Sequence, residues 1–349
     1  MKKPALATLH RYEYNAERDR LCAHTMPVEE VVMKKRWTDL FFTLVMLAML
    51  PLLLAVALGL YFARLMVNPP RAKQWRTPHD EGWEYENVYF EANDGVPISS
   101  WFIPARDDGP CPAVVIVHGW TWNRLGNAAG DMLARIAHSS RVDLLQPARA
   151  LHDAGYHVLM LDLRNHGRSG SSPTVTFGYG EAADLLGAVT FLKSREDVDA
   201  GRIGVLGYSM GANAVMFACA RTEDVKAAIA VQPVRPFAFA HHLAHSLLGP
   251  LGGVALNVAR RVYYNAGGPL WETTDPAIVA DLIGPTAIMY VQGEGDPWGD
   301  VPNVRRFYEL SAEPKALHVV PSNDRFGGYL YLGEHPEVLL DFFAQHLVE

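Results

Sequence analysis

The chain has 349 residues, of which 49% are hydrophobic and 10% aromatic, so it can bury a large core and is not a disordered protein. Its formal net charge of −7 gives no general attraction to nucleic acid, which needs a concentrated basic face. The three cysteines, Cys22, Cys111 and Cys219, cannot build a disulfide framework or a CxxC metal site, and no metal or cofactor is expected.

Residues 40–63 form an uninterrupted run of 24 residues without a charge. About 20 helical residues cross the hydrocarbon core of a bilayer, so this run predicts one transmembrane helix. A cleaved signal peptide is the alternative, but its apolar region is usually about 7 to 15 residues long and lies close to the amino terminus. We therefore expect a retained membrane anchor at 40–63, preceded by a polar tail at 1–39 that a partner protein would order.

Basic residues flank the expected anchor on both sides. Lys34, Lys35 and Arg36 directly precede it, and four basic residues follow within residues 64–76. The positive-inside rule favours a cytoplasmic amino terminus and places the large carboxy-terminal domain outside the cytoplasm.

Residues 64–82 carry three prolines and predict a stiff, extended linker that holds the next domain away from the membrane. The domain itself is expected at residues 83–349. Two strand-like stretches flank a turn at Asp94 and Gly95, which predicts an antiparallel hairpin. Short apolar runs then alternate with helical segments, the pattern of a mainly parallel, doubly wound α/β sheet covered on both faces.

The segment "GYSMG" at residues 207–211 follows the apolar run "RIGVL" and precedes the helical "GANAVMFACA". A Gly-x-Ser-x-Gly pattern between a strand and a helix makes the sharp turn that exposes a nucleophilic serine. With this motif, residues 83–348 resemble the α/β-hydrolase fold of serine esterases and lysophospholipases. The resemblance implies that Ser209 is the nucleophile.

Two further segments match motifs of that family. "VVIVHGW" ends an earlier strand, and the resemblance assigns the oxyanion hole to the backbone N–H groups of Trp120 and Met210. "DLRNHGRSG" at residues 162–170 resembles a structural segment of the family. We interpret His118 and His166 as residues that shape these loops rather than as proton acceptors.

The acid of the family follows the next-to-last strand. "MYVQGEGDPWGDVP" resembles its Gly-x-x-Asp pattern and nominates Asp296, with Glu294 and Asp300 as alternatives.

The histidine that the family places after the last strand is missing. Serine needs an imidazole to take its proton, yet the loop contains "SNDRFGG", and alignment on its two glycines puts Phe326 at the histidine position. His318 lies too early, inside the last strand, and His335 begins the final helix. Both stay open as replacement bases.

Residues 234–268 form an apolar insertion, which the resemblance makes part of a helical cap at about 234–282 that covers the site. His241, His242 and His245 share a helix face there, but no carboxylate or cysteine nearby completes a metal site.

Two functions follow from these patterns. The first is a membrane-anchored hydrolase of esters or lipids that uses Ser209 and Asp296, with an incomplete triad. The alternative is a catalytically impaired hydrolase-fold protein that serves as an accessory or scaffolding subunit of a membrane protein complex.

Overall fold

The structure is a computed structural model that describes residues 28–107, 109–130 and 140–347. The chain forms two compact units, Met1–Leu54 and Ala55–Glu349. Residues 1–27 of the predicted tail at 1–39 lie outside the described residues.

Helix α2 (Val28–Val67) contains the predicted membrane segment and extends beyond both of its ends. From Val32 onward it is long and apolar enough to cross a membrane, by length and composition. In the first unit its apolar side chains are exposed, for example Phe41, Met46 and Leu50. From Ala55 onward the helix belongs to the second unit, where Ala63 and Met66 are buried.

The second unit is built on one sheet of eight strands, as the alternating pattern predicts. In spatial order the strands are β1 (Glu86–Glu91), β2 (Pro97–Ile103), β6 (His157–Leu161), β3 (Cys111–Val117), β7 (Val198–Tyr208), β8 (Val225–Val231), β9 (Ala287–Gly293) and β10 (Lys315–Val320). The strands β1 and β2 form the predicted antiparallel hairpin, and β2 pairs antiparallel with β6. All other pairs are parallel. A small second sheet joins β4 (Gly126–Asn127) to β5 (Val142–Asp143).

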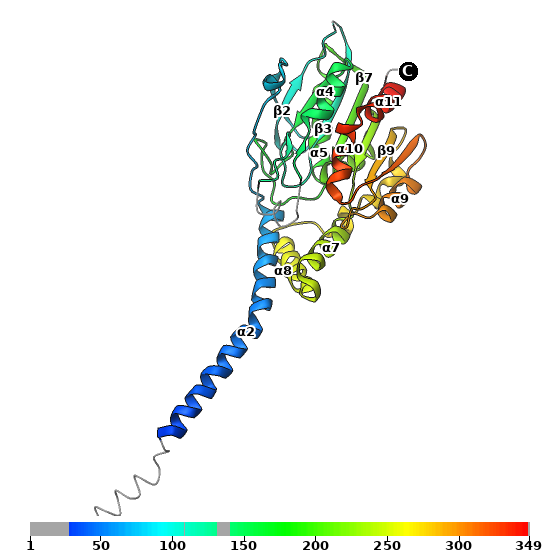
Figure 1. Cartoon of the computed structure of the whole chain (residues 1–349). Helices are drawn as coiled ribbons and strands as arrows, with labels where there is room; N and C mark the ends of the chain where they lie inside the picture. Colours follow the sequence, from blue (N-terminus) through cyan, green and yellow to red (C-terminus); the bar gives the residue numbers. More distant parts are fainter. Residues whose placement is uncertain (1–27, 108, 131–139, 348–349) are drawn as a thin grey trace, which may run out of the picture. The chain divides into compact units, whose positions relative to one another are not determined.

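Helices cover both faces of the large sheet (Figure 1). The core on one face includes side chains of α5 (Ala182–Lys193), α6 (Met210–Cys219) and α9 (Val301–Leu310). The core on the other face includes side chains of α4 (Leu145–Asp153), α10 (Arg325–Glu334) and α11 (Pro336–Leu347). The sheet is therefore doubly wound, and its strands are continuous apolar runs because both faces are buried.

The predicted cap is helical. It consists of α7 (Pro236–Leu248), α8 (Gly252–Asn265) and the short 3₁₀ turns η2 (Gly249–Leu251), η3 (Trp271–Thr274), η4 (Pro276–Ile278) and η5 (Ala280–Leu282). These elements follow β8 and precede β9, so the chain leaves the sheet and returns to it at neighbouring strands. The cap therefore begins one strand after the turn that carries Ser209.

The segment 64–82 differs from the extended spacer that its prolines predict. Its first residues complete α2, and Pro78–Glu81 forms the 3₁₀ turn η1. Between them, Nη1 of Arg71 donates hydrogen bonds of 2.6 to 3.0 Å to the backbone carbonyls of His166, Gly167 and Ser169. The segment lies against the domain because these bonds and the packing of Trp75 hold it there.

Candidate active site

Ser209 stands at the turn between β7 and α6, the context that the Gly-x-Ser-x-Gly pattern demands. Its φ angle is 53°, in the left-handed region that residues other than glycine rarely adopt. A Cβ at Gly207 would lie 2.4 Å from the carbonyl oxygen of Gly211, and a Cβ at Gly211 would lie 2.4 Å from that of Val117. The turn therefore requires glycine at both positions.

The guanidinium of Arg325 lies between Ser209 and Asp296. Its Nη2 donates a hydrogen bond of 3.2 Å to Oγ of Ser209 and one of 3.0 Å to the carbonyl oxygen of Gln232. Its Nη1 forms an ion pair with Oδ2 of Asp296, and its Nε donates to the hydroxyl of Tyr329. An arginine thus occupies the place between serine and acid where a hydrolase triad carries histidine.

The structure corrects the prediction of Phe326 at this place. Helix α10 begins at Arg325, and the Asp324 side chain caps it by accepting hydrogen bonds from the N–H groups of Phe326 at 2.8 Å and Gly327 at 3.0 Å. Phe326 packs in the core, with its ring centroid 5.8 Å from that of Tyr329. The prediction was wrong by one residue because it treated the start of a capped helix as a loop.

Asp296 follows β9 and faces the site, where the sequence pattern put it. Its Oδ1 accepts a hydrogen bond of 3.0 Å from the N–H of Trp298, and its Oδ2 accepts one of 3.3 Å from Nε2 of Gln292. Of the two alternatives, Asp300 caps α9 by accepting from the N–H of Asn303, and Glu294 is exposed. Asp296 is therefore the carboxylate that pairs with Arg325.

Neither Arg325 nor Tyr329, two buried polar side chains beside Ser209, is suited to take the proton of the Ser209 hydroxyl. Burial alone would lower the pKa of Arg325, but the Asp296 carboxylate and the nearby Tyr329 raise it above its ordinary value. Burial raises the pKa of Tyr329 as well. Both groups stay protonated near neutral pH and donate hydrogen bonds, whereas general base catalysis needs an acceptor with a pKa near the working pH.

The two histidines kept open as replacement bases lie elsewhere. His318 stands within β10, opposite Val291 of β9. His335 ends α10, is half exposed, and its Nδ1 lies 3.2 Å from a carboxylate oxygen of Glu337. Among the residues that the structure describes, no hydrogen bond joins either imidazole to Ser209.

His118 and His166 are fully buried and bonded to backbone groups. Nε2 of His118 accepts from the N–H of Leu163 at 3.0 Å, and Nε2 of His166 accepts from that of Thr121 at 3.2 Å. In each ring Nδ1 lies within 2.8 Å of a backbone carbonyl. Burial lowers the pKa of His118 to about 3, so it is neutral. The two rings join the loop after β3 to the loop after β6.

Backbone N–H groups of Trp120 and Met210 were predicted to form an oxyanion hole. Both residues line a pocket together with Ser209. Met210 is the first residue of α6, whose leading N–H groups have no partner within the helix. Within the described part of the chain, neither N–H has a hydrogen-bond acceptor, so each is free to donate to an oxygen of a bound ligand.

The pocket beside Ser209 is apolar and lies between the sheet, the cap and the end of α2. It holds about 720 Å³ of space, part of which is open to solvent. Its lining residues are Phe62, Met66, Trp120, Phe177, Ser209, Met210, Val234, Pro236, Phe239, Ala240, Leu243, Ala244, Ala255, Leu256, Ala259 and Trp271. No charged side chain belongs to this lining, so its surface favours apolar groups.

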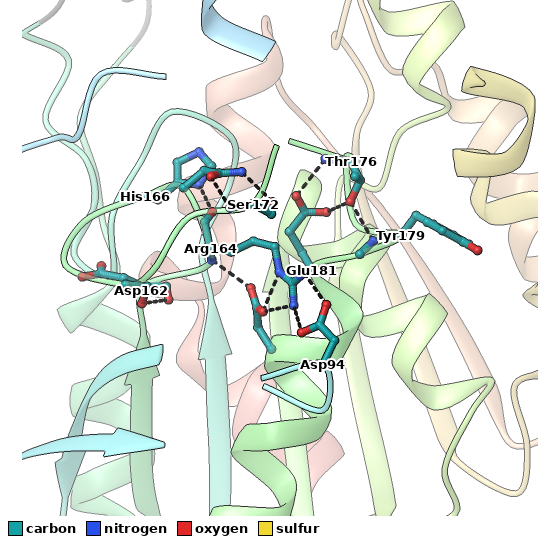
Figure 2. Close-up of polar contacts among 12 residues, drawn as sticks. Asp94, Asp162, Arg164, His166, Ser172, Thr176, Tyr179 and Glu181 are labelled. Carbon is teal, nitrogen blue, oxygen red and sulfur yellow. Dashed lines mark hydrogen bonds and ion pairs between the residues drawn. The ribbon is translucent and has the colours of Figure 1, made fainter. Parts of the chain in front are cut away.

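Phe177 of this lining stands on a loop that a buried carboxylate holds in place. Figure 2 shows Glu181 facing Thr176. Glu181 accepts hydrogen bonds from the N–H of Thr176 at 2.8 Å, from the Thr176 hydroxyl at 2.5 Å and from the N–H of Gly178 at 2.8 Å. These bonds fix the backbone on both sides of Phe177, whose own φ is 54°.

The preceding part of the same loop is fixed by Arg164, which also appears in Figure 2. Its guanidinium binds Asp94 in the turn between β1 and β2, at 2.6 Å, and Asp184 on α5, at 2.7 Å. The loop after β6 is thus tied to the hairpin and to α5, and its residue Phe177 forms part of the pocket wall.

The three cap histidines make no metal site in the structure. The rings of His241 and His245 stack with centroids 4.1 Å apart on α7. Among the described residues, no group of three or more histidine, cysteine, aspartate or glutamate side chains converges as metal ligands would.

Comparison with known proteins assigns this chain to a family. A sequence profile described as the alpha/beta hydrolase family matches residues 114–348. The chain is 30% identical over 202 residues to the uncharacterized protein YqkD of Bacillus subtilis, a match that covers 56% of this chain and 65% of YqkD. It is 25% identical over 254 residues to the uncharacterized protein YfhR of Escherichia coli K12, covering 71% of this chain and 75% of YfhR.

Solved structures show the same fold. The esterase Pf2001 of Pyrococcus furiosus superposes with a TM-score of 0.62 at 24% sequence identity, covering 81% of this chain and 98% of the esterase. The alpha/beta hydrolase GrgF of Penicillium sp. sh18 superposes with a TM-score of 0.54 at 22% identity, covering 76% of this chain and all of GrgF.

Proposed function

Because this chain belongs to the alpha/beta hydrolase family, we propose that it is a membrane-anchored member whose Ser209 site binds acyl esters or lipids and hydrolyses them very slowly. The single observation that carries this proposal is the Arg325 guanidinium between Ser209 and Asp296. The apolar pocket supports the ligand class, because its lining contains no charged side chain that would pair with a charged ligand.

The expected rate follows from the missing base. In one well-studied serine hydrolase, loss of the histidine costs roughly a millionfold in turnover, and about 10³-fold acceleration over water remains from the oxyanion hole and binding. Arg325 donates to the Ser209 hydroxyl and has no lone pair for its proton. We therefore expect this site to retain binding and transition-state stabilisation but not serine activation.

The membrane anchor is the finer part of the proposal. The 36 residues of α2 from Val32 onward contain an 18-residue stretch with a mean hydropathy of 2.6, and only 6% of that stretch is buried. A core helix of a soluble domain would be mostly buried, and a signal peptide has a shorter apolar region. These two properties favour a retained anchor.

A fluorophosphonate probe tests the state of Ser209, because the probe reacts only with an activated hydroxyl. We expect slow labelling of the natural protein and faster labelling of Arg325→His, since an imidazole supplies the proton acceptor that a guanidinium lacks. The gain should vanish in Arg325→His/Ser209→Ala. Phe326→His is the matched control: its side chain packs in the core, so the same residue one position later should not raise labelling.

Chain length of the probe tests the ligand class. Arg325→His should react faster with a long-chain alkyl fluorophosphonate than with a short-chain one, because the longer chain buries more surface in the pocket. Rapid labelling of the natural protein at Ser209 would refute the proposed role of Arg325.

An accessory role in a membrane protein complex is the second candidate, and the unactivated Ser209 favours it too. It becomes the better account if neither the natural protein nor Arg325→His reacts with either probe, although both fold and co-purify with the same membrane proteins.

A further inference from the structure

The last two turns of α2 are part of the pocket wall. Phe62 and Met66 line the pocket that contains Ser209. Met66 is also packed in a hydrophobic cluster with Ala259 and Tyr263 of α8. The helix that would cross the membrane therefore ends as one side of the candidate active site rather than at a distance from it.

A close helix crossing fixes this wall. A Cβ on Gly59 of α2 would lie 2.5 Å from the carbonyl oxygen of Ala255 and 2.9 Å from Cβ of Val258, both on α8. Only glycine permits that approach between the two backbones, an arrangement frequent between helices in membranes. The cap and the end of α2 are held together as one packed body (Figure 1).

Hydrogen bonds tie the end of α2 to the loops of the site. The last carbonyl groups of a helix lack partners within the helix. Here Nε1 of Trp120 donates a hydrogen bond of 3.2 Å to the carbonyl oxygen of Leu65, and the N–H of Val175 donates one of 2.8 Å to the carbonyl oxygen of Met66. Trp120 is also the residue whose backbone N–H is assigned to the oxyanion hole. The helix end and the oxyanion-hole loop are therefore joined directly.

The position of Phe62 in the sequence indicates where the pocket lies relative to the bilayer. Phe62 falls within the uncharged run of residues 40–63, and Arg64 is the first charge after it. A charged residue at the end of a membrane span lies at the interface, so Phe62 lies at the edge of the hydrocarbon layer when α2 spans it. The apolar pocket and the apolar bilayer then meet at the same turn of α2.

We propose that the pocket is filled from the bilayer: the acyl chain of a membrane lipid enters beside Phe62 and Met66, and its head group comes to lie at Ser209. This inference rests on the membrane anchor and acyl-chain pocket of the proposed function. It names the source of the ligand as the surrounding membrane rather than water. The head-group chemistry is a fatty-acid carboxylate or a lysolipid ester, both of which carry one acyl chain.

Photocrosslinking from lipid tests the route. The full chain is placed in phosphatidylcholine nanodiscs that contain either a fatty acid or a lysophosphatidylcholine with a diazirine near the chain end. After irradiation we expect adducts on the pocket residues Phe62, Phe239 and Leu243. The probe that gives them identifies the lipid class.

Two tryptophan variants of α2 provide the matched comparison. Met66→Trp fills the pocket and should lower pocket adducts about tenfold, which corresponds to about 1.4 kcal/mol of binding free energy. Leu60→Trp changes a side chain that is 50% exposed and does not line the pocket, so it should leave the adducts unchanged. Melting curves of both variants show whether they keep the fold.

Adducts confined to exposed residues of α2, such as Leu53, Leu54 and Leu60, would overturn the inference, because the probe would then contact the helix without entering the pocket. This failure is distinct from failure of the proposed function. If Arg325→His still prefers the long-chain fluorophosphonate in micelles, the pocket binds chains but does not receive them from the bilayer. If that preference is absent too, both proposals fall.

Discussion

The substitution Asp296→Asn tests the buried ion pair of the site. The side chains of Asp296 and Arg325 are 0% and 3% exposed, so the pair is shielded from water. Removal of the carboxylate leaves a guanidinium that cannot lose its proton and is buried without a counter-ion. Breaking a buried pair in this way costs about 3 to 5 kcal/mol of the free energy of unfolding. We expect about 3 kcal/mol, because Tyr329 and the Gln232 carbonyl still bind Arg325.

The assay is denaturant unfolding of the full chain in detergent, followed by tryptophan fluorescence. Asp300→Asn is the matched control: Asp300 caps α9, and asparagine caps a helix about as well as aspartate, so stability should hardly change. Replacing both partners, in Asp296→Asn/Arg325→Gln, removes the unpaired charge and should recover part of the loss. A loss below about 1 kcal/mol for Asp296→Asn would refute the account of a buried, obligately charged arginine.

Three further predictions follow. Deletion of residues 1–54 should leave a cooperatively folded unit in detergent. Deletion of residues 1–68 also removes Ala63 and Met66 from their cluster, so it should lower the melting temperature by roughly 5 °C or more. Equal melting temperatures of the two fragments would contradict the packing of α2 on the cap. The pKa of His118 is about 3 in the folded chain against 6.5 ordinarily, so the unfolded chain takes up a proton first as the pH falls. The free energy of unfolding should therefore fall by about 2 kcal/mol between pH 7 and pH 5 from this group alone. Stability that does not change over that interval would refute the buried, neutral state of His118. Protease added to spheroplasts should digest the hydrolase domain and spare the tail, as the basic cluster Lys34, Lys35 and Arg36 implies, while protection of the domain would reverse the topology.

The fold was predictable because each of its signals is local. Apolar runs of strand length alternate with helical segments, and the turn residues Asp94 and Gly95 mark the hairpin that opens the sheet. Ser209 was found through its two glycines, and Asp296 through its distance from the end of a strand. The structure places both residues against the guanidinium of Arg325, and their catalytic roles stay predictions.

Arg325 was missed because the direction of its side chain depends on where a helix begins. Alignment on Gly327 and Gly328 counts residues along a loop, but the chain is already helical there. The signal was Asp324, a preferred N-cap residue, which would have predicted a helix starting at Arg325. One residue of register in the first turn decides whether a guanidinium or a phenyl ring faces the serine.

The packing of α2 on the cap was missed for a different reason. An apolar run long enough to cross a membrane carries no periodic pattern that distinguishes a lipid-facing turn from one facing protein. Gly59 and Ala63 were the available signal, since small residues four apart allow close helix contact. The partners of Gly59, Ala255 and Val258, lie nearly two hundred residues away, and sequence alone does not bring them together.

Arg325 changes what the retained parts of the site are able to do. The strained turn at Ser209, the N–H groups of Trp120 and Met210 and the apolar pocket all remain, and in the proposed function they would bind and polarise an ester without removing a proton. Arginine adds four contacts in place of a proton acceptor, and these contacts join the turn after β7, the residue after β8, the loop after β9 and helix α10. In the proposed function, the position that carries the proton relay in an active hydrolase would act here as a clamp on these four segments beside the apolar pocket. Ligand affinity and rate would then be set by separate residues, so exchange of the single side chain at Arg325 should change the rate at Ser209 while the apolar pocket stays as it is.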